Sequence, residues 1–310
     1  MEHGDQPTRS VLYMPGSKPR ALDKARSLPA DALILDLEDA VLPAEKPRAR
    51  DLVAEAVRAG GYGGRRVLIR INGLDTEWGA ADLAAAAAAG PDAILLPKVE
   101  RPADILRAAD LMAGHGAPDR TRLWAMMETP RAILNAGAIA ACHPRLEGFV
   151  MGTNDLAKDL GAAQTSDRAA LLPSLAICLL AARAEGLIAV DGVHNAFRDL
   201  DGLRAACLQG RDLGFDGKTL IHPDQIAIAN AVFAPDPEAL ALARAQVAAF
   251  DAAIARGEGV AVLDGRIVEN LHVAMARRLL ARAAAIAARG EPPSGAAAPV
   301  PASELQKVAP

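Results

Sequence analysis

Aromatic residues and cysteines are scarce in this chain of 310 residues. Phenylalanine, tryptophan and tyrosine make up only 3% of the sequence, which leaves no set of rings on which a single-stranded nucleic acid could stack. The formal net charge of −4 provides no basic surface for a nucleic-acid backbone. The cysteines, Cys142, Cys178 and Cys207, are widely spaced and odd in number, which speaks against a disulfide framework or a cysteine-rich zinc site. We therefore expect no nucleic-acid partner and a reducing environment.

Long apolar runs are also missing. The longest uncharged stretches, such as residues 169–182, fall short of the roughly 20 residues that a membrane-spanning helix needs, and Pro173 interrupts that stretch. The first ten residues carry charges of both signs and no apolar core, unlike a secretory signal. Hydrophobic residues nevertheless make up 51% of the chain, enough for a large aliphatic core. These features predict a cytoplasmic protein with no membrane partner.

Short, strongly apolar segments alternate with longer segments rich in alanine and leucine. The short segments are residues 11–15, 32–38, 67–71, 92–98, 122–128, 146–152, 187–191 and 217–222. Near-continuous apolar character is typical of strands that are covered on both faces, and the segments between them have helical lengths. Eight such repeats predict a TIM (β/α)8 barrel with a C-terminal helical lid extension. A doubly wound open sheet is the alternative. That fold requires a glycine-rich phosphate-binding loop after the first strand, but VLYMPGSKPR has only one glycine there.

The alternation stops at APDPE, residues 234–238, so we predict a barrel over residues 9–233. Two further helical stretches follow, separated by a glycine-punctuated hairpin or loop at 257–270. We interpret residues 234–288 as an appendage that forms a lid over the barrel or over a neighbouring subunit. Residues 289–310 are rich in proline and alanine and predict a flexible tail.

Polar side chains gather where the expected strands end, which is where barrel enzymes place their catalytic residues. They are Asp36, Glu38, Asp39, Arg70, Asn72, Lys98, Glu128, Asn154, Asp155, Asp191, His194 and His222. Most of them would be costly to bury without partners or a metal ion, so we expect one convergent site.

Glu128 and Asp155 are the strongest metal-ligand candidates, because each ends or closely follows an apolar strand and the two strands are expected to be neighbours. Two carboxylates without a set of cysteines or histidines suit a hard ion that keeps water or substrate in its shell. Mg²⁺ fits best and Mn²⁺ next. The alternative is that one carboxylate forms a structural ion pair with Arg70 or Lys98.

Arg70 lies among apolar residues in VLIRIN and must find an anion. It either binds a substrate carboxylate or carbonyl through two donors, or it pairs with Asp36 or Glu38. We include Asp36 with Arg70 and Glu128 among the catalytic candidates, and Asn72 with Arg70 and Glu128 among the substrate-binding ones. Lys98 could form a Schiff base, but a lysine close to two carboxylates is expected to be paired and protonated, which favours the metal-dependent alternative.

Eight motifs occur in an order that resembles the citrate lyase β-subunit-like branch of the HpcH/HpaI aldolase superfamily, which includes malyl-CoA and citramalyl-CoA lyases. They are VLYMPGSKPR, LILDLEDAV, RINGLDT, LLPKVE, MMETPRAI, GTNDLAKDLG, DGVH and GFDGKTLIHPDQ. The resemblance covers roughly residues 9–275. It implies a Mg²⁺-dependent barrel enzyme that acts on an acyl-CoA and a small keto acid. It also implies a homo-oligomer, a trimer or a dimer of trimers.

The resemblance assigns roles to individual residues. Glu128 and Asp155 correspond to the Mg²⁺ ligands, and Arg70 to a substrate-binding residue. Four positions correspond to coenzyme A contacts: Lys18, Arg20, Ile221 and Pro223. Asp264, in the LDG motif, corresponds to a catalytic carboxylate that reaches into an adjacent subunit's site. GTN at residues 152–154 departs from the GA or GP that usually precedes the metal-binding aspartate.

The leading hypothesis is a Mg²⁺-dependent carbon–carbon lyase that cleaves or forms a 3-hydroxyacyl-CoA of the malyl-, citramalyl- or citryl-CoA type. Such a reaction chelates a hydroxy or keto acid at the metal and stabilises a thioester enolate. One alternative is a malyl-CoA thioesterase, which follows with hydrolysis. Two others are an aldolase acting on free pyruvate and a non-autonomous β subunit of a citrate lyase complex.

Overall fold

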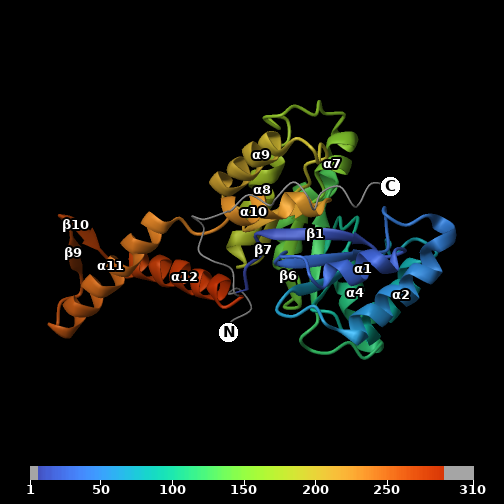
Figure 1. Ribbon diagram of the computed structural model, residues 1–310, viewed down its shortest axis with the longest axis horizontal. Coiled ribbons are helices and arrows are strands. Elements are labelled where there is room, and N and C mark those ends of the chain that lie inside the picture. The colour runs from blue at the N-terminus through green and yellow to red at the C-terminus, as the bar shows by residue number, and fades with distance from the viewer. Residues whose placement is uncertain (1–5, 290–310) are drawn as a thin grey trace, which may run out of the picture. The chain divides into compact units, whose positions relative to one another are not determined.

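A computed structural model of the chain describes residues 6–289, and eight parallel strands form a closed barrel within it (Figure 1). The strands are β1 (Ser10–Pro15), β2 (Ala32–Asp36), β3 (Arg66–Arg70), β4 (Ala93–Leu96), β5 (Arg122–Met127), β6 (Leu146–Met151), β7 (Ile188–Asp191) and β8 (Gly217–Leu220). Each strand pairs with the next, and β1 pairs with β8 from Ser10 opposite Lys218 to Leu12 opposite Leu220. The (β/α)8 prediction is therefore confirmed.

Alternate residues of the strands point to opposite faces, and both faces are buried. Val11, Ile34, Leu68, Trp124 and Val150 belong to one apolar cluster, built almost entirely from strand residues, that fills the barrel. The intervening strand residues pack together with apolar residues of the surrounding helices in a second cluster. This double burial explains why the strand segments of the sequence are apolar throughout rather than alternating.

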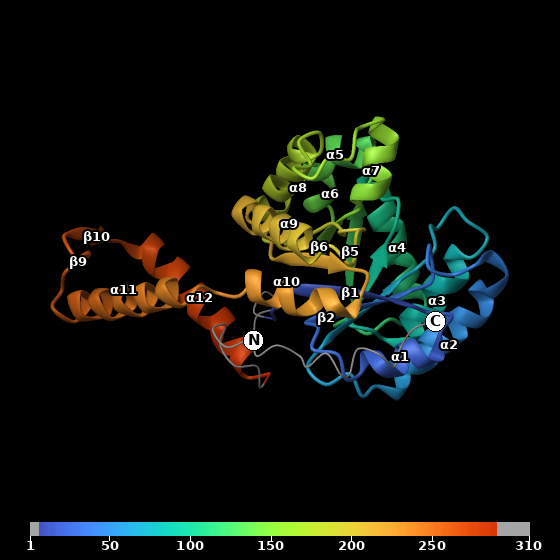
Figure 2. The same ribbon diagram turned by 45° about the horizontal axis from the view of Figure 1, so that its top comes forward.

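Helices surround the barrel between successive strands (Figure 2). They are α1 (Pro19–Ala25), α2 (Lys46–Ala59), α3 (Gly79–Ala89), α4 (Pro102–Gly114), α5 (Pro130–Leu134), α6 (Ala136–Ala140), α7 (Thr153–Leu160), α8 (Leu172–Ala184), α9 (Leu200–Leu213) and α10 (Ile226–Val232). Two short 3-10 turns, η2 (Pro43–Glu45) and η3 (Pro223–Gln225), precede α2 and α10. Several helices begin with proline at the first helical position, and α3, α7 and α9 end at a left-handed glycine, which are favourable start and stop residues.

A buried ion-pair network joins β7 and β8 on the outer face of the barrel. Lys218, fully buried, donates to Asp191 Oδ2 at 2.7 Å, and Arg168 Nη1 donates to both oxygens of Asp191 at 2.8 and 2.9 Å. A Cβ on Gly210 of α9 would lie 2.9 Å from Asp191 Oδ2, so any larger residue at this position would crowd the carboxylate. Burial works to raise the pKa of Asp191, but Lys218 and Arg168 outweigh it and hold that pKa below its ordinary value. Asp191, expected in the site, is thus a structural residue.

Residues 234–289 belong to a second compact unit, separate from Thr8–Phe233. It contains α11 (Pro237–Ala255), the hairpin strands β9 (Ala261–Leu263) and β10 (Arg266–Val268), and α12 (Asn270–Ala287). Phe250, Ala253, Ala261, Val268 and Val273 form its small apolar core. Apart from residue 289, the tail predicted for residues 289–310 lies outside the described residues.

The stretch Pro223–Ala255 is long and apolar enough to cross a membrane by length and composition. In the structure it is not one uninterrupted helix, because residues 233–236 separate α10 from α11.

Candidate active site

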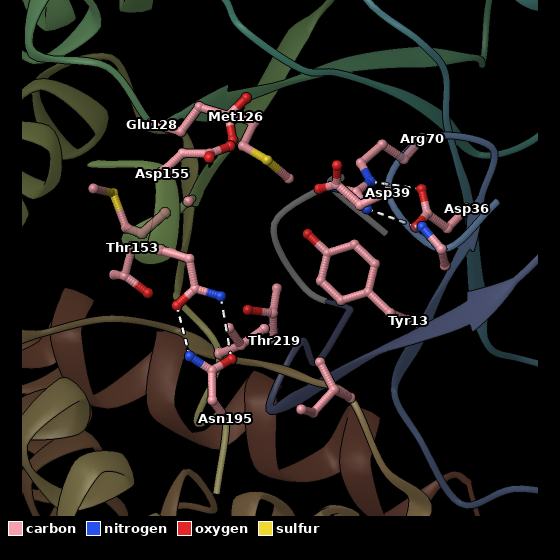
Figure 3. A pocket seen from close by; sticks show the side chains of 16 residues that line it. Tyr13, Asp36, Asp39, Arg70, Met126, Glu128, Thr153, Asp155, Asn195 and Thr219 are labelled. Atoms are coloured by element: carbon pink, nitrogen blue, oxygen red, sulfur yellow. Dashed lines mark hydrogen bonds and ion pairs between the residues drawn. The ribbon is translucent and has the colours of Figure 1, made fainter. Parts of the chain in front are cut away.

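A cavity of about 310 Å³ opens at the carboxyl ends of the strands (Figure 3). Its walls include Tyr13, Asp36, Arg70, Glu128, Asp155 and Asn195, which come from the ends of β1, β2, β3 and β5 and from the segments after β6 and β7. Arg70 and Asp36 lie on one side in Figure 3, Glu128 and Asp155 on the other, with Tyr13 between them. The convergent site expected from the strand ends is therefore present, with two charged centres that face a common space.

The first centre contains Glu128 and Asp155, which the fold brings together with Lys98. Lys98 follows β4 in a left-handed conformation, with φ of 53°, and its backbone N–H donates to Glu128 Oε1 at 2.7 Å. Its ammonium group forms ion pairs with Glu128 Oε1 at 3.5 Å and with Asp155. A Cβ on Gly152 would lie 2.4 Å from the Cβ of Glu128, so β5 and β6 end this close together only because residue 152 is a glycine.

The carboxylate oxygens of this centre are the ligand type that a hard divalent cation prefers. Burial raises the pKa of Glu128 to about 7 despite Lys98, whereas hydrogen bonding and charge from Lys98 overcome burial and lower the pKa of Asp155. The Lys98 ammonium shows that a cation fits between the two carboxylates. Within residues 6–289 no group of three or more acidic, histidine or cysteine side chains could hold a metal ion, so these two would leave most positions of a Mg²⁺ shell for water and substrate. The residues present thus fit the expected ion.

The second centre is built around Arg70 at the end of β3. Its Nε and Nη2 each donate to Asp36 at 2.6 Å, and its Nη1 lies 2.8 Å from Glu38 Oε2 and 3.2 Å from Asp39 Oδ2. The guanidinium stacks over the ring of Tyr13, with 4.9 Å between its central carbon and the ring centroid. Burial works to lower the pKa of Arg70, but Asp36 and its neighbours raise it well above its ordinary value. Arg70 is a fixed positive charge.

Asp36 was expected among the catalytic carboxylates, and its surroundings correct that assignment. Besides Arg70, it accepts hydrogen bonds from the backbone N–H groups of Glu38 and Ala40. Both oxygens are therefore engaged, and the side chain is 1% exposed. Asp36 orients Arg70 and has no free oxygen with which to accept a proton from substrate.

Asn72 was expected to bind substrate, but it does not line the cavity. Its Nδ2 donates to Asp82 at 2.6 Å and to the carbonyl of Leu37 at 2.9 Å, and its Oδ1 accepts from Lys46 at 2.6 Å. Asn72 lies beyond the last residue of β3, where its side chain joins α2 and α3 instead of entering the barrel mouth. It is a structural residue.

The expected coenzyme A contacts lie at the ends of β1 and β8. Lys18 and Arg20 are exposed at the start of α1. Ile221 is 41% exposed and lines the cavity, and Pro223 begins η3. Their contact with coenzyme A stays a prediction.

Asp264 belongs to the second unit. Asp264 and Gly265 are the two central residues of the β9–β10 hairpin, with φ of 48° and 74°, the backbone that a two-residue type I′ turn requires. The side chain is exposed at the hairpin tip. The turn function of this Asp-Gly pair is thus established, and its catalytic role stays a prediction.

Two features of the cavity had no role assigned from the sequence, although Asn154 was among the polar residues expected to converge there. Asn154 and Asn195 hydrogen-bond to each other on its wall, and Tyr13 lies beside Arg70. Asn154 stands in the GTN departure, which was the available signal. Asn195 lies in an irregular loop after β7, where no periodic pattern marks a residue as facing the site.

Comparison with known proteins gives this site a family context. The sequence profile of the HpcH/HpaI aldolase/citrate lyase family matches residues 9–223. The chain belongs to this family. It is 31% identical to CitE from Mycobacterium tuberculosis, solved in complex with magnesium, acetoacetate and coenzyme A, with a TM-score of 0.72 over 90% of this chain and 99% of that one.

Relatives within the HpcH/HpaI family correct the predicted lyase activity. The (3S)-malyl-CoA thioesterase of Cereibacter sphaeroides strain KD131 is 60% identical over 93% of this chain and 99% of its own length. Homologues from three further strains, 58–59% identical, carry the same name. The L-malyl-CoA/beta-methylmalyl-CoA lyase of strain ATCC 17029 is 34% identical over 91% of this chain and 96% of its own length. The carbon–carbon lyase prediction was therefore wrong, because motifs shared by both activities do not distinguish hydrolysis from cleavage.

Proposed function

We propose that this protein is a thioesterase that hydrolyses (3S)-malyl-CoA to malate and coenzyme A. The observation that carries the proposal is the 60% identity, over nearly the whole length of both chains, to a (3S)-malyl-CoA thioesterase. The cavity supports it, because its carboxylates Glu128 and Asp155 would hold a cation for the hydroxy acid end of such a substrate, and the same cavity is lined by the fixed guanidinium of Arg70.

Glu128 and Asp155 would hold Mg²⁺, and the bound ion would supply positive charge for the hydroxyl and carboxylate of the malyl group. The ammonium of Lys98 forms ion pairs with both carboxylates, which marks the place between them where a cation fits. A cation held at this place would favour a small acid that carries both a hydroxyl and a carboxylate over a simple acyl chain.

Arg70 would stabilise the negative charge that develops on the thioester oxygen during attack by water. Asp36 fixes the guanidinium through two hydrogen bonds, so little reorganisation is needed when that charge appears. Asp39 is largely exposed and lines the cavity beside Arg70, which makes it a carboxylate able to accept a proton from water within this chain's own site.

Lys18 and Arg20 would attract the phosphates of coenzyme A, with Ile221 and Pro223 beside its adenine. Asp264 would act on the site of an adjacent subunit in a trimer or a dimer of trimers. We place the enzyme in the cytoplasm, a setting in which the free cysteines Cys142, Cys178 and Cys207 are stable.

The test is to incubate the purified protein with (3S)-malyl-CoA and Mg²⁺ and to measure free thiol and malate. Acetyl-CoA and glyoxylate, the products of carbon–carbon cleavage, are measured in the same samples. We expect thiol and malate in equal amounts and in excess over glyoxylate. Release of glyoxylate without malate would contradict the proposal, and Glu128→Gln serves as the inactive control.

A further inference from the structure

Two asparagine side chains form a reciprocal pair on the cavity wall. Asn154 lies at the start of α7, next to Asp155, and Asn195 lies in the loop after β7. Asn154 Nδ2 donates to Asn195 Oδ1 at 3.1 Å, and Asn195 Nδ2 donates to Asn154 Oδ1 at 2.7 Å. Figure 3 shows these two bonds at Asn195, on the side of the cavity that holds Asp155. Both side chains line the cavity and are exposed.

The backbone brings these two side chains together. A Cβ on Gly192 would lie 2.4 Å from Thr153 Oγ1, so the end of β7 approaches the start of α7 only because residue 192 is a glycine. From the other side, Gln225 Nε2 donates to the carbonyl of His194 at 3.0 Å and ties the β7 loop to the segment after β8. The location of the pair therefore depends on three strand ends and not on its own two hydrogen bonds.

Each amide retains hydrogen-bonding capacity. A primary amide has two N–H donors and two carbonyl lone pairs, and the reciprocal pair uses one of each per side chain. No other hydrogen bond engages either side chain within residues 6–289. Exposed amides exchange hydrogen bonds with water at little net gain, so stability does not account for the pair. Asn154 and Asn195 each present one donor and one acceptor to the cavity without adding charge beside Asp155.

We propose that the Asn154–Asn195 pair positions the water that attacks the thioester carbonyl, and thereby favours hydrolysis over carbon–carbon cleavage. This inference rests on the proposed thioesterase function. Hydrolysis needs a water molecule held against the carbonyl carbon and a donor for the carbonyl oxygen. An amide oxygen supplies the first by accepting a hydrogen bond from the water, and an amide N–H adds to the charge that Arg70 supplies for the second.

The atoms of this step balance without a further reactant. The water oxygen forms the new C–O bond while the carbonyl π electrons move onto the carbonyl oxygen. When they return, the C–S bond breaks and its electron pair stays on sulfur. One water proton passes through a carboxylate of the site to the departing sulfur, and the other is released as the new carboxylic acid ionises. Carbon–carbon cleavage consumes no water, so a residue that acts on water affects the two reactions differently.

The experiment compares Asn154→Ala and Asn195→Ala with the wild-type holoenzyme, using (3S)-malyl-CoA and saturating Mg²⁺. We expect kcat for hydrolysis to fall by about 10-fold or more, with KM within about twofold of wild type, because a positioned group at the reacting carbonyl acts on the transition state. The ratio of malate to glyoxylate should fall in parallel, and Mg²⁺ affinity measured by calorimetry should not change.

The matched control is Asn230→Ala. This amide also makes two side-chain hydrogen bonds, accepting from Ser10 Oγ at 2.7 Å and donating to the carbonyl of Pro29 at 2.8 Å, but it does not line the cavity. Its product ratio and kcat should match those of the wild type. Asn195→Asp, which keeps the acceptor and loses the donor, should recover less than half of the lost kcat.

Three outcomes would overturn the inference. Unchanged kcat and product ratio in both alanine variants would remove the pair from the reaction. A parallel loss of hydrolysis, cleavage and Mg²⁺ affinity would show a structural role. A wild-type enzyme that does not hydrolyse malyl-CoA would overturn the proposed function and this inference with it, whereas the first two outcomes leave the proposed function standing.

Discussion

Replacing Asp191 by asparagine tests the buried charge network on the outer face of the barrel. The substitution keeps the size of the side chain and removes the charge that faces Lys218 and Arg168. Lys218 is 0% exposed, and Asp191 is the only hydrogen-bond partner of its ammonium within the described residues. Arg168 retains a bond to Gln209 at 2.8 Å.

The expected cost follows from that difference between the two cations. Leaving one fully buried charge without its partner costs about 3–5 kcal/mol, and the neutral amide of the variant cannot replace the charge of the carboxylate. We therefore expect the free energy of unfolding to fall by about 3–5 kcal/mol at pH 7. The exposed pair of Arg277 and Asp251, separated by 2.8 Å as are Arg168 and Asp191, is the matched control, and Asp251→Asn should cost less than about 1 kcal/mol.

The pH dependence gives a second reading of the same variant. The pKa of Asp191 is lower in the folded chain than its ordinary value, which is about 3.9 for an unfolded aspartate. Its contribution to stability is therefore complete above that value and is lost as the pH falls through the folded pKa. Asp191→Asn should show a shallower loss of stability than the wild type as the pH is lowered below about 5.

Urea unfolding followed by the fluorescence of Trp78 and of Trp124, which is fully buried inside the barrel, measures both quantities. A cost below about 1 kcal/mol at pH 7, or an acid profile identical to that of the wild type, would refute the reasoning. The double variant Asp191→Asn, Lys218→Met removes the stranded charge and should be more stable than Asp191→Asn alone.

Three further predictions concern the site. Glu128→Gln and Asp155→Asn should each abolish Mg²⁺-dependent turnover and weaken Mg²⁺ binding in calorimetry while circular dichroism stays unchanged; full wild-type activity in excess chelator would contradict the metal assignment. Arg70→Lys should reduce kcat at least about 10-fold, because an ammonium cannot reproduce the two-donor fork, and near-native steady-state kinetics would demote Arg70 to a structural partner. Co-expressed Asp264→Ala and Glu128→Gln chains should recover part of the activity that each variant lacks alone, and verified mixed oligomers without recovery would exclude a shared site.

The sequence predicted the barrel well because strand burial leaves a strong local signal. The predicted strand at 187–191 differs from β7 by one residue, and the carboxylates at the ends of β5 and after β6 meet as expected. Strand order and parallel pairing follow from the alternation alone, so residues separated by helical segments could be placed at one edge. Glu128 and Asp155 were found in this way.

The remaining site residues depend on geometry that alternation does not encode. Asn72 was misassigned because its partner Lys46 reaches it from α2, which no strand pattern reveals. Asp36 was misassigned because two backbone N–H groups of its own loop occupy its oxygens. Asn195 was missed because its position depends on the close approach that Gly192 allows between two loops.

The pairing of β1 with β8 determines when the chain can complete its fold during synthesis. Leu12 finds its partner Leu220 only after the ribosome has released nearly the whole barrel. Until then, β1 and the most recently synthesised strand each expose a row of unpaired N–H and C=O groups, to which strands of other chains can bind. Such late, non-local closure slows folding and prolongs that exposure. A nascent chain that stalls before Gly217 would carry two open sheet edges for as long as the stall lasts.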